Sequence, residues 1–307
     1  MAIQWYPGHM HKAQKEIRQI MPQVDLVIEV LDARIPYSSN NPMVPSLRGE
    51  TPCIKILNKS DLADPEKTKE WQAYLELEQG VKTLALTAEE PSQVHQILDL
   101  CRKMVPQKES SFKPISTMIM GIPNVGKSTL INTLAGKVIA KVGNEPAVTK
   151  RQQKINLGNG ILLSDTPGIL WPKFENPDSG YRLAVTGAVK NTAMEFEDVA
   201  MYASAYLLRA YPERVQERYK LDELPGSDLE LLEAIGNKRG CRRSGGMVDL
   251  HKASEILLNE LRSGMLGQVT YETPEMVQAE EIKMEEVRAQ KEAEKADKAA
   301  KRKKRRR

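Results

Sequence analysis

The chain has 307 residues, of which 40% are hydrophobic and 5% aromatic, so it has room for one large domain and a smaller one. It contains no apolar stretch as long as a membrane span, and its 3 scattered cysteines fit neither a disulfide framework nor a zinc site. We expect no signal peptide, no membrane binding and a location in the reducing cytoplasm.

The net charge of +4 is unevenly distributed along the chain. The last seven residues, 301–307, are all Lys or Arg, and removing them leaves the rest of the chain at −3. Blocks of like charge are typical of disordered tails that bind polyanions such as RNA. A solvated tail without function is the alternative.

The N-terminal half alternates between predicted strands and helices. A polar helix is expected over 11–20 and a Pro/Ser/Asn-rich loop over 36–45. Apolar runs predict buried strands at 24–31, 53–57, 81–86 and 115–120. Helical patterns follow at 64–77, 92–105 and 128–134. This alternation predicts an α/β fold with a parallel sheet.

The segment NKSD, residues 58–61, directly follows the second predicted strand. Open α/β sheets bind their ligands at this end of the strands. The Asp61 carboxylate can accept hydrogen bonds from both N1–H and the N2 amino group of guanine, whereas adenine would leave it unpaired. Asn58 can bind guanine N7 or tie loops together, and the Lys59 stem can lie over the base. The segment therefore predicts guanine recognition.

The segment GIPNVGKS, residues 121–128, has the G-x-x-x-x-G-K-[ST] pattern of a phosphate-binding loop between a strand and a helix. Gly121 and Gly126 allow backbone N–H groups to wrap around a phosphate. Lys127 can reach the β- and γ-phosphates, and the Ser128 hydroxyl can bind Mg²⁺. These residues predict that the chain binds a nucleoside triphosphate.

Two short strands are predicted at 154–157 and 161–164, and the second ends in the segment DTPG, residues 165–168. Asp165 is expected to hold Mg²⁺ through water, and the Gly168 N–H to contact the γ-phosphate. Thr149 is the candidate for the Thr that closes on Mg²⁺ while the γ-phosphate is present. An ordinary Pro-Gly turn is the alternative for DTPG.

The GTP site is thus expected to draw on several segments. Thr87-Ala88 follows the third strand, where a backbone N–H would back guanine O6. The residues expected to bind GTP are Asn58, Lys59, Ser60, Asp61, Thr87, Ala88, Asn124, Val125, Gly126, Lys127, Ser128, Thr129 and Gly168. Those expected to bind Mg²⁺ are Ser128, Thr149 and Asp165.

From residue 180 onward the pattern changes to helices without intervening strands. Helical segments are predicted at 183–190, 196–211, 229–235 and 249–262. We expect a GTPase domain over 1–178, a smaller all-α domain that binds RNA or the ribosome over 179–274, and a charged, disordered basic tail over 275–307. A charged helix is the alternative for this last segment.

The order of the motifs differs from that of small GTPases, in which the phosphate loop comes first and NKxD follows DxxG. Here NKSD precedes the phosphate loop. The same sheet can form if the chain is cut after DxxG and rejoined elsewhere, which is tolerated where native termini lie close together. We therefore predict a circularly permuted P-loop GTPase domain with a mostly parallel sheet.

The chain resembles the ribosome biogenesis GTPase A family over nearly its whole length. The resemblance is carried by the permuted order together with WYPGHM at 5–10, DARIP at 32–36, NKSD, GIPNVGKS, DTPGILWP at 165–172, KRG at 238–240 and GG at 245–246. It implies a bacterial factor acting late in assembly of the large ribosomal subunit, with a helical domain that holds ribosomal RNA. We expect a monomer. Ala147, where many members have Gly, and the basic tail depart from the family pattern.

The residue that orients the attacking water is not evident from the motifs, because Ile169 occupies the position of the Gln of Ras-type GTPases. The resemblance points to His9, which can orient or accept a proton from water at neutral pH. Capping of the first helix or contact with RNA is the alternative. Asn124 matches the Asn of GTPases that hold K⁺ beside the phosphates, with a loop-stabilising hydrogen bond as the alternative.

Two hypotheses of function remain open. In the first, the protein is an RNA-stimulated GTPase that binds large-subunit precursors in its GTP state and is released on hydrolysis. In the second, it is a GTP-gated RNA-binding scaffold with incidental hydrolysis. Ile169 predicts slow turnover of the protein alone under both. A GTPase of tRNA or metabolism is disfavoured, since no further cofactor motif is present.

Overall fold

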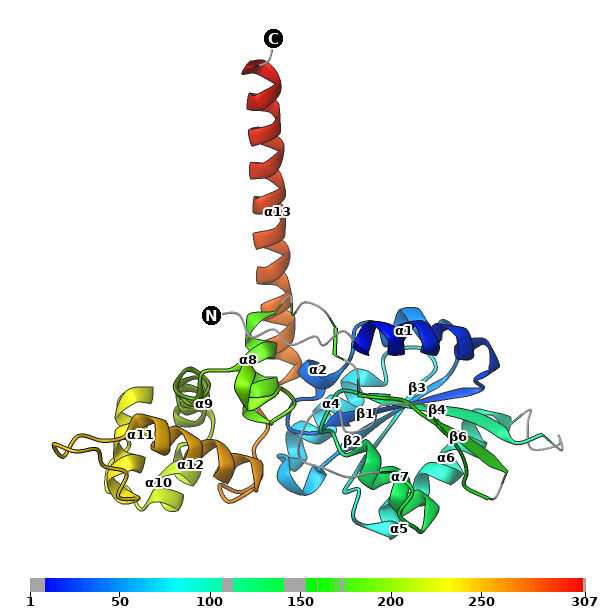
Figure 1. Ribbon diagram of the computed structural model, residues 1–307, viewed down its shortest axis with the longest axis horizontal. Helices are drawn as coiled ribbons and strands as arrows, with labels where there is room; N and C mark the ends of the chain where they lie inside the picture. Colours follow the sequence, from blue (N-terminus) through cyan, green and yellow to red (C-terminus); the bar gives the residue numbers. More distant parts are fainter. Residues whose placement is uncertain are drawn as a thin grey trace.

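The computed structural model describes residues 9–106, 113–140, 153–158, 160–168, 170–171, 174 and 176–305. A six-stranded sheet lies at its centre, in the order β3-β2-β1-β4-β6-β5 (Figure 1). Its strands are β1 (Leu26–Asp32), β2 (Cys53–Asn58), β3 (Val81–Leu86), β4 (Ile115–Gly121), β5 (Gln153–Asn156) and β6 (Ile161–Asp165). All neighbours are parallel except β5 and β6, which are antiparallel.

The strand order reflects the permuted chain. The chain runs outward from β1 through β2 to β3, and it then crosses back to form β4 on the other side of β1. β1 and β2 are buried at every position, as expected for central parallel strands covered on both faces. In Figure 1, helix α1 (His9–Ile20) covers one face, and α6 (Gln96–Met104) and α7 (Lys127–Ala135) cover the other. Because the strands are parallel, every motif after β2, β3, β4 and β6 reaches the same edge.

Several predicted elements of the GTPase domain differ in detail. The expected loop over 36–45 contains α2 (Pro36–Ser39) and the start of α3 (Val44–Arg48), because Pro36 and Pro45 preset the backbone of a first helical turn. The single helix expected over 92–105 is divided into α5 (Pro91–Val94) and α6. Helix α4 (Pro65–Leu75) begins as predicted, since the Asp64 side chain caps it. Short 3₁₀ turns are η1 (Met21–Gln23) and η2 (Ser60–Leu62).

The helical part begins earlier than predicted and holds one more helix. The segment expected at 183–190 is α8 (Pro177–Val185), because Asn176 caps a helix that starts with Pro177. Helix α10, missed by the prediction, restarts the chain at Pro212. The helices that follow α8 are η4 (Asn191–Ala193), α9 (Phe196–Ala210), α10 (Pro212–Tyr219), α11 (Asp228–Lys238) and α12 (Leu250–Arg262). Helices α9, α11 and α12 pack against one another around buried leucines.

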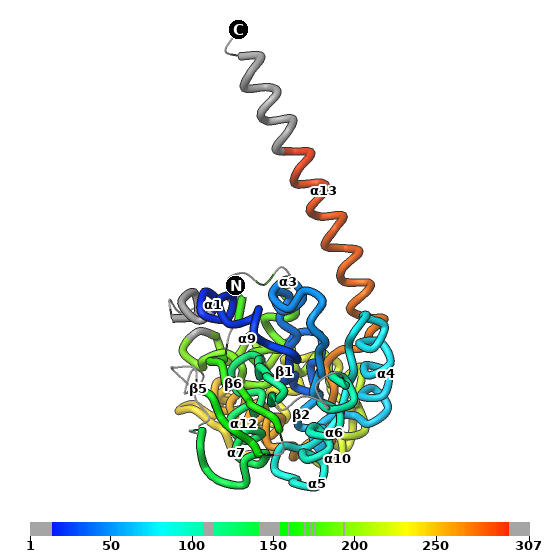
Figure 2. The backbone as a smooth tube through the Cα atoms, turned by 90° about the vertical axis from the view of Figure 1, so that its right-hand side faces the viewer, coloured from blue at the N-terminus to red at the C-terminus, as the bar shows by residue number. Residues whose placement is uncertain are grey.

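The last element is α13 (Pro274–Arg305), the charged-helix alternative for this segment. It projects from the rest of the molecule (Figure 2). Its first turns are held at the GTPase domain, where Val277 packs with Leu31, Leu57 and Trp71. No helix in the described residues is long and apolar enough to cross a membrane.

Candidate nucleotide-binding site

The phosphate loop has a backbone that requires glycine at two positions. Gly121 has φ +152° and Gly126 has φ +93°. A Cβ on Gly121 would lie 2.5 Å from the Val30 carbonyl oxygen, and one on Gly126 would lie 2.2 Å from Nδ2 of Asn58. Both glycines are therefore needed for close approach as well as for backbone geometry. The loop ends at the N-terminus of α7, where helix N–H groups favour a phosphate.

The Lys127 ammonium lies inside this loop. It donates to the carbonyl oxygens of Gly121, at 3.2 Å, and Ile122, at 3.1 Å. Burial lowers the pKa of Lys127 to about 8, against the opposing charge of Asp165. A buried cation that donates to carbonyl groups gains strongly from a polyanionic ligand, because phosphate oxygens return the charge stabilisation that burial removes.

The DTPG segment rests directly on the phosphate loop. Asp165 ends β6 and is buried, and the Thr166 hydroxyl donates to the Ile119 carbonyl at 2.8 Å. A Cβ on Gly168 would lie 3.0 Å from Pro123 and 3.2 Å from Nζ of Lys127. A side chain at 168 would crowd the phosphate loop, so the DTPG segment lies close against this loop.

The oxygen donors at this edge suit Mg²⁺. The Ser128 hydroxyl at the start of α7 and the Asp165 carboxylate at the end of β6 are hard ligands of the kind that Mg²⁺ prefers. Among the described residues, no group of three or more His, Cys, Asp or Glu side chains is arranged to hold a metal ion. This donor set fits an ion that shares its coordination with substrate phosphates and water.

Asn58 joins three loops on the base side of the site. Its Nδ2 donates to the Val125 carbonyl at 2.7 Å, and its Oδ1 accepts from the Ala88 N–H at 2.9 Å. Asn58 therefore ties loops together, one of the two roles that the sequence left open. We expected a backbone N–H of Thr87-Ala88 to contact guanine O6, and the Ala88 N–H donates to Asn58 in this structure.

Asp61 lies at the outer end of the same loop and is exposed. Its Oδ1 accepts from the Thr87 hydroxyl at 2.9 Å, which leaves further lone pairs of the carboxylate for another ligand. The Thr87 N–H donates to Oε1 of Gln93 at 2.9 Å. Ser60 is half-buried at the start of η2. The two loops predicted to contact the base are thus in mutual contact.

Asp32 is a site residue that sequence reasoning named only as part of DARIP. Lys59, in a left-handed conformation with φ +60°, donates from Nζ to Asp32 at 2.9 Å and to the Asn124 carbonyl at 2.7 Å. The Arg34 guanidinium donates two hydrogen bonds to Asp32, at 2.9 and 2.7 Å, and the Arg34 N–H donates a third at 3.1 Å. Burial alone would raise the pKa of Asp32, but the cations of Arg34 and Lys59 hold it well below its usual range. The sequence signal that could have identified Asp32 is a charged residue at the end of an apolar strand.

Asn124 joins the phosphate loop to the helical part of the chain. It has φ +60°, and its Nδ2 donates to the Gly187 carbonyl, just after α8, at 2.8 Å. This is a loop-stabilising hydrogen bond, which the sequence left open as the alternative to K⁺ binding by Asn124. Asn124 Oδ1 is the oxygen on which a K⁺ role depends, and an amide oxygen is a hard ligand of suitable chemistry.

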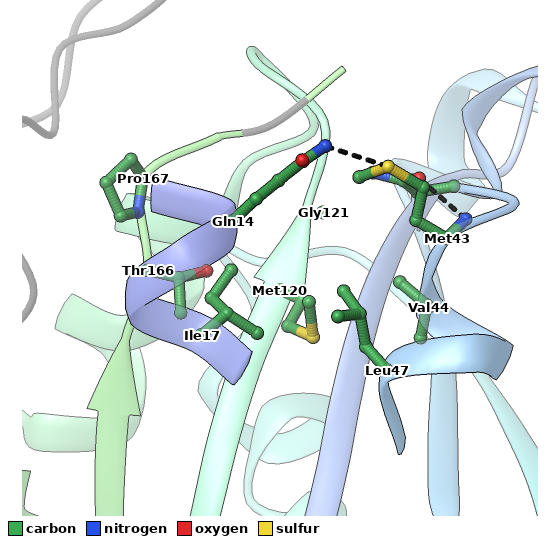
Figure 3. Close-up of a pocket in the computed structure, with 10 residues that line it drawn as sticks. Gln14, Ile17, Met43, Val44, Leu47, Met120, Gly121, Thr166 and Pro167 are labelled. Carbon is green, nitrogen blue, oxygen red and sulfur yellow. Dashed lines mark hydrogen bonds between the residues drawn. The ribbon is translucent and has the colours of Figure 1, made fainter. Parts of the chain in front are cut away.

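Two predicted residues lie outside the described residues, namely Thr149 and Ile169. His9 is the first residue of α1, and its side chain also lies outside them. The placement of α1 is nevertheless informative. Figure 3 shows a small cavity between this helix, which contributes Gln14 and Ile17, and Thr166 of the DTPG segment.

The cavity links α1 to both nucleotide loops. Its remaining lining residues are Asn41, Met43, Val44, Leu47, Met120, Gly121 and Pro167. Gln14 donates from Nε2 to Sδ of Met43 at 2.8 Å, which ties α1 to the segment before α3. The helix that carries His9 is therefore held beside DTPG.

Comparisons with known proteins agree with this geometry. A family described as 50S ribosome-binding GTPase matches residues 116–209. That range includes the phosphate loop and DTPG but excludes NKSD, as expected if the motifs are permuted. A ribosome biogenesis GTPase A from Bacillus cereus is 46% identical over 94% of this chain and 100% of its own. One from Thermotoga maritima is 33% identical over 89% of this chain and 95% of its own.

A solved structure is also similar. The crystal structure of GNP-bound YlqF from T. maritima has a TM-score of 0.59 and 30% identity, covering 86% of this chain and 99% of the other. The similarity therefore extends over the sheet and the helical part together, rather than over the phosphate loop alone.

Proposed function

The chain belongs to the ribosome biogenesis GTPase A family, and we propose that it binds precursors of the large ribosomal subunit in its GTP state and leaves them on hydrolysis. GTP hydrolysis and a place in ribosome biogenesis follow from family membership. The identity of the particle and its timing are the proposal. The description of the matching family, 50S ribosome-binding GTPase, supports the choice of the large subunit.

One observation carries the proposal: the helical part touches the edge of the sheet where the nucleotide motifs meet. Asn124 in the phosphate loop bonds to Gly187. Beyond NKSD, the Leu62 carbonyl accepts from the Val269 N–H at 2.9 Å, and the Asp64 N–H donates to the Thr270 hydroxyl at 3.0 Å. A rearrangement of the nucleotide loops on hydrolysis would therefore change contacts with the segment that meets RNA.

We assign residues 1–178 to the GTPase domain, 179–274 to an RNA-binding helical domain and 275–307 to a basic tail. The basic segment formed by the end of α11 and the loop after it is the proposed docking surface, with Lys238, Arg239, Arg242 and Arg243 exposed. Arg242 pairs with Val248 across this loop, which gives it a defined shape. Phosphate contacts from such a loop would position the protein on folded RNA.

The proposed GTP site uses the residues expected from the motifs. Asp61 would read guanine, and Lys127 and Gly168 would hold the β- and γ-phosphates. Ser128 and Asp165 would hold Mg²⁺, which would supply positive charge to the transferred phosphoryl group. The buried Lys127 ammonium adds charge from the protein side. Removal of the γ-phosphate takes away the ligand of the Gly168 N–H and so releases the DTPG segment.

For water activation we propose His9, because α1 lies beside DTPG and Ile169 has no polar group. His9→Ala should leave GTP affinity near normal and lower particle-stimulated kcat, since a loss confined to kcat marks a transition-state role. Single-turnover hydrolysis with saturating large-subunit particles measures this. An unchanged rate assigns His9 to a structural or RNA-contact role.

The test of the whole proposal compares binding and turnover. Protein loaded with a non-hydrolysable GTP analogue should cosediment with large-subunit precursors, whereas GDP-loaded protein should not. The same particles should raise the rate of hydrolysis well above that of the free protein. Binding that depends on GTP without any rise in turnover favours the alternative, a GTP-gated scaffold with incidental hydrolysis.

Base choice is tested separately. Asp61→Asn should weaken GTP binding strongly and shift preference toward xanthosine triphosphate, because an amide complements xanthine better than guanine. Calorimetric titration of both proteins with GTP, ATP and xanthosine triphosphate measures the shift. Equal affinities of the unaltered protein for ATP and GTP would remove Asp61 from base recognition.

A further inference from the structure

The contact between Asn124 and Gly187 is part of a longer chain of hydrogen bonds that ends in the helical domain. Gly187 follows the last turn of α8 and has φ +80°, a left-handed residue that ends the helix. The Ala188 N–H returns to the Leu183 carbonyl at 2.9 Å, which closes the turn. The carbonyl of Gly187 is thereby directed outward, toward the phosphate loop.

Arg262 holds this turn from the other side. It is the last residue of α12, and its guanidinium donates to the carbonyls of Ala184, at 2.7 Å, and Val185, at 3.0 Å. These carbonyls belong to the last turn of α8, where a helix supplies too few donors of its own. A third bond, at 3.4 Å, reaches Asn191. A single side chain of α12 therefore fixes the end of α8.

The conformation of the turn also favours glycine. A Cβ on Gly187 would lie 3.3 Å from Nε of Arg262, and the positive φ strains any L side chain. Arg262 therefore lies next to the position that a side chain at 187 would occupy. Because Arg262 holds the Ala184 and Val185 carbonyls, a displacement of Arg262 would also shift the Gly187 carbonyl that follows them.

Asn124 is held at both its main chain and its side chain. Its carbonyl accepts from Lys59, and its Nδ2 donates to Gly187, each across a distance below 3 Å. Because the amide plane is rigid, fixing Nδ2 on Gly187 also fixes the direction of Oδ1. The helical domain thus determines how the one long polar side chain between Gly121 and Lys127 is oriented.

We propose that Arg262 is a positioning residue for GTP hydrolysis, which acts through Gly187 to orient the amide of Asn124 in the phosphate loop. The inference rests on the proposed role of Asn124 beside the phosphates. It gives the helical domain a direct means of regulating turnover. A displacement of α12 relative to α8 would release the turn and lower the catalytic competence of the loop.

The test uses three variants of the full chain. Arg262→Met keeps an unbranched apolar side chain in place of the aliphatic stem and removes the guanidinium donors, and Arg262→Lys restores a positively charged donor group. Arg218→Met is the matched control, because Arg218 binds α12 through Glu260, at 2.8 and 2.9 Å, rather than through the turn after α8. Hydrogen exchange of the peptides covering 115–135 and 180–195 reports on the loop independently of activity.

Arg262→Met should lower kcat by about tenfold, because small misplacements of a group at the reacting centre cost this much or more. The KM for GTP should change by less than about twofold. Exchange should accelerate in both peptides. Arg262→Lys should recover part of the loss, and Arg218→Met should match the unaltered protein. If Arg262→Met and Arg218→Met behave alike in kcat and exchange, the inference is overturned.

The dependence of turnover on K⁺ distinguishes the positioning role of Arg262 from ion binding by Asn124. If the unaltered protein turns over faster in K⁺ than in Na⁺ and Asn124→Ala abolishes the difference, the ion role stands. An unchanged K⁺ response of Arg262→Met then overturns only the positioning by Arg262. If the unaltered protein shows no preference for K⁺, the ion role fails, and faster exchange with reduced kcat in Arg262→Met still supports positioning.

Discussion

Two of the interfaces between the helical part of the chain and the GTPase domain are built differently from each other. The first, here called the anchor, consists of Ser38, Trp71, Arg182, Glu272 and Glu280. The second, the nucleotide-edge contacts, consists of the bonds Asn124–Gly187, Leu62–Val269 and Asp64–Thr270. Helix α8 takes part in both, because Arg182 lies within it and Gly187 follows its end.

The anchor is a buried ionic network. Glu272 is completely buried and accepts from the Ser38 N–H at 2.9 Å, the Ser38 hydroxyl at 2.6 Å and Arg182 at 3.3 Å. Its carbonyl accepts from the Trp71 indole at 2.9 Å. Arg182 also binds Glu280 in the first turns of α13. Separating these groups would leave charges uncompensated in the interior.

The nucleotide-edge contacts are single hydrogen bonds between neutral groups. Each contributes on the order of 1 kcal/mol, and water can replace a missing partner where the groups are accessible. The two interfaces therefore have separate tasks. The anchor holds the domains together, whereas the edge contacts are weak enough to change with the nucleotide. Variants of each interface test this division, beginning with the anchor.

Breaking the anchor should have the largest effect. Arg182→Met leaves Glu272 buried without its cation, and we expect a loss of about 3–5 kcal/mol in unfolding free energy. Denaturation followed by circular dichroism at pH 8 measures the loss. A decrease below about 1 kcal/mol, the size of a single neutral hydrogen bond, would show that the anchor does not hold the domains together.

The same variant has a defined pH dependence. Burial raises the pKa of Glu272, and Arg182 opposes that rise. A carboxyl whose pKa is raised by folding gives stability below its unfolded pKa that is lost as pH rises. The deficit of Arg182→Met should therefore shrink toward pH 5. Adding Glu272→Gln to Arg182→Met should remove this pH dependence, since the charge is then absent.

Glu29 serves as a comparison with Glu272. It is also a buried carboxyl, but it lies within the GTPase domain alone and does not join two domains. It is buried in β1, opposite Lys55 of β2, and accepts from the Asn41 N–H at 3.0 Å. Burial, outweighing the charge of Lys55, raises its pKa from 4.5 to about 7. The stability that Glu29 contributes is fully present below its unfolded pKa of 4.5, and it is lost as pH rises through its folded pKa of about 7.

Glu29→Gln should therefore lose this pH dependence. Relative to the variant, the unaltered protein should lose up to about 3 kcal/mol of stability between pH 5 and pH 8. Paired denaturation curves at both pH values measure the change. Domain docking, followed by exchange in the peptide covering 264–281, should stay constant. Parallel pH profiles of the two proteins would contradict the titration of Glu29.

The edge contacts should respond less in stability. Thr270→Val removes the acceptor of the Asp64 N–H and should cost about 1 kcal/mol. Because Asp64 follows NKSD and caps α4, the affinity for GDP should fall by a few-fold at most. Fluorescence titration with a labelled nucleotide measures this. A destabilisation as large as that of Arg182→Met would erase the distinction between the two interfaces.

The sequence predicted the elements whose signal is local. Strand β3 has the predicted bounds 81–86, because an apolar run between turn residues specifies it alone. Parallel pairing then brings the ends of β2, β3, β4 and β6 to one edge, so the motifs also predicted where the site is built. The prediction missed the start of α8 at Pro177 and the separate helix α10 at Pro212. Proline interrupts a helix, but it is also favoured in the first turn of a new one.

The interfaces were beyond prediction from sequence for a different reason. Glu272 and Arg182 are 90 residues apart, and neither lies in a motif. Their pairing depends on how the helical part rotates onto the sheet, which local periodicity does not encode. The same holds for Gly187 and Arg262. Asp32 was closer to prediction, because a charge at the carboxyl end of a buried strand is a local signal.

The basic end of α13 should have the smallest effect on stability. The base of this helix belongs to the anchor, whereas residues 301–307 add only positive charge. Deleting them should leave unfolding and GTP binding unchanged, because an all-basic run buries no apolar surface. RNA binding should weaken, and its salt dependence should flatten by about 0.7–0.9 log units for each phosphate that the deleted residues neutralise. Salt titrations with purified large subunits compare the two proteins, and equal slopes would identify a solvated end that takes no part in binding.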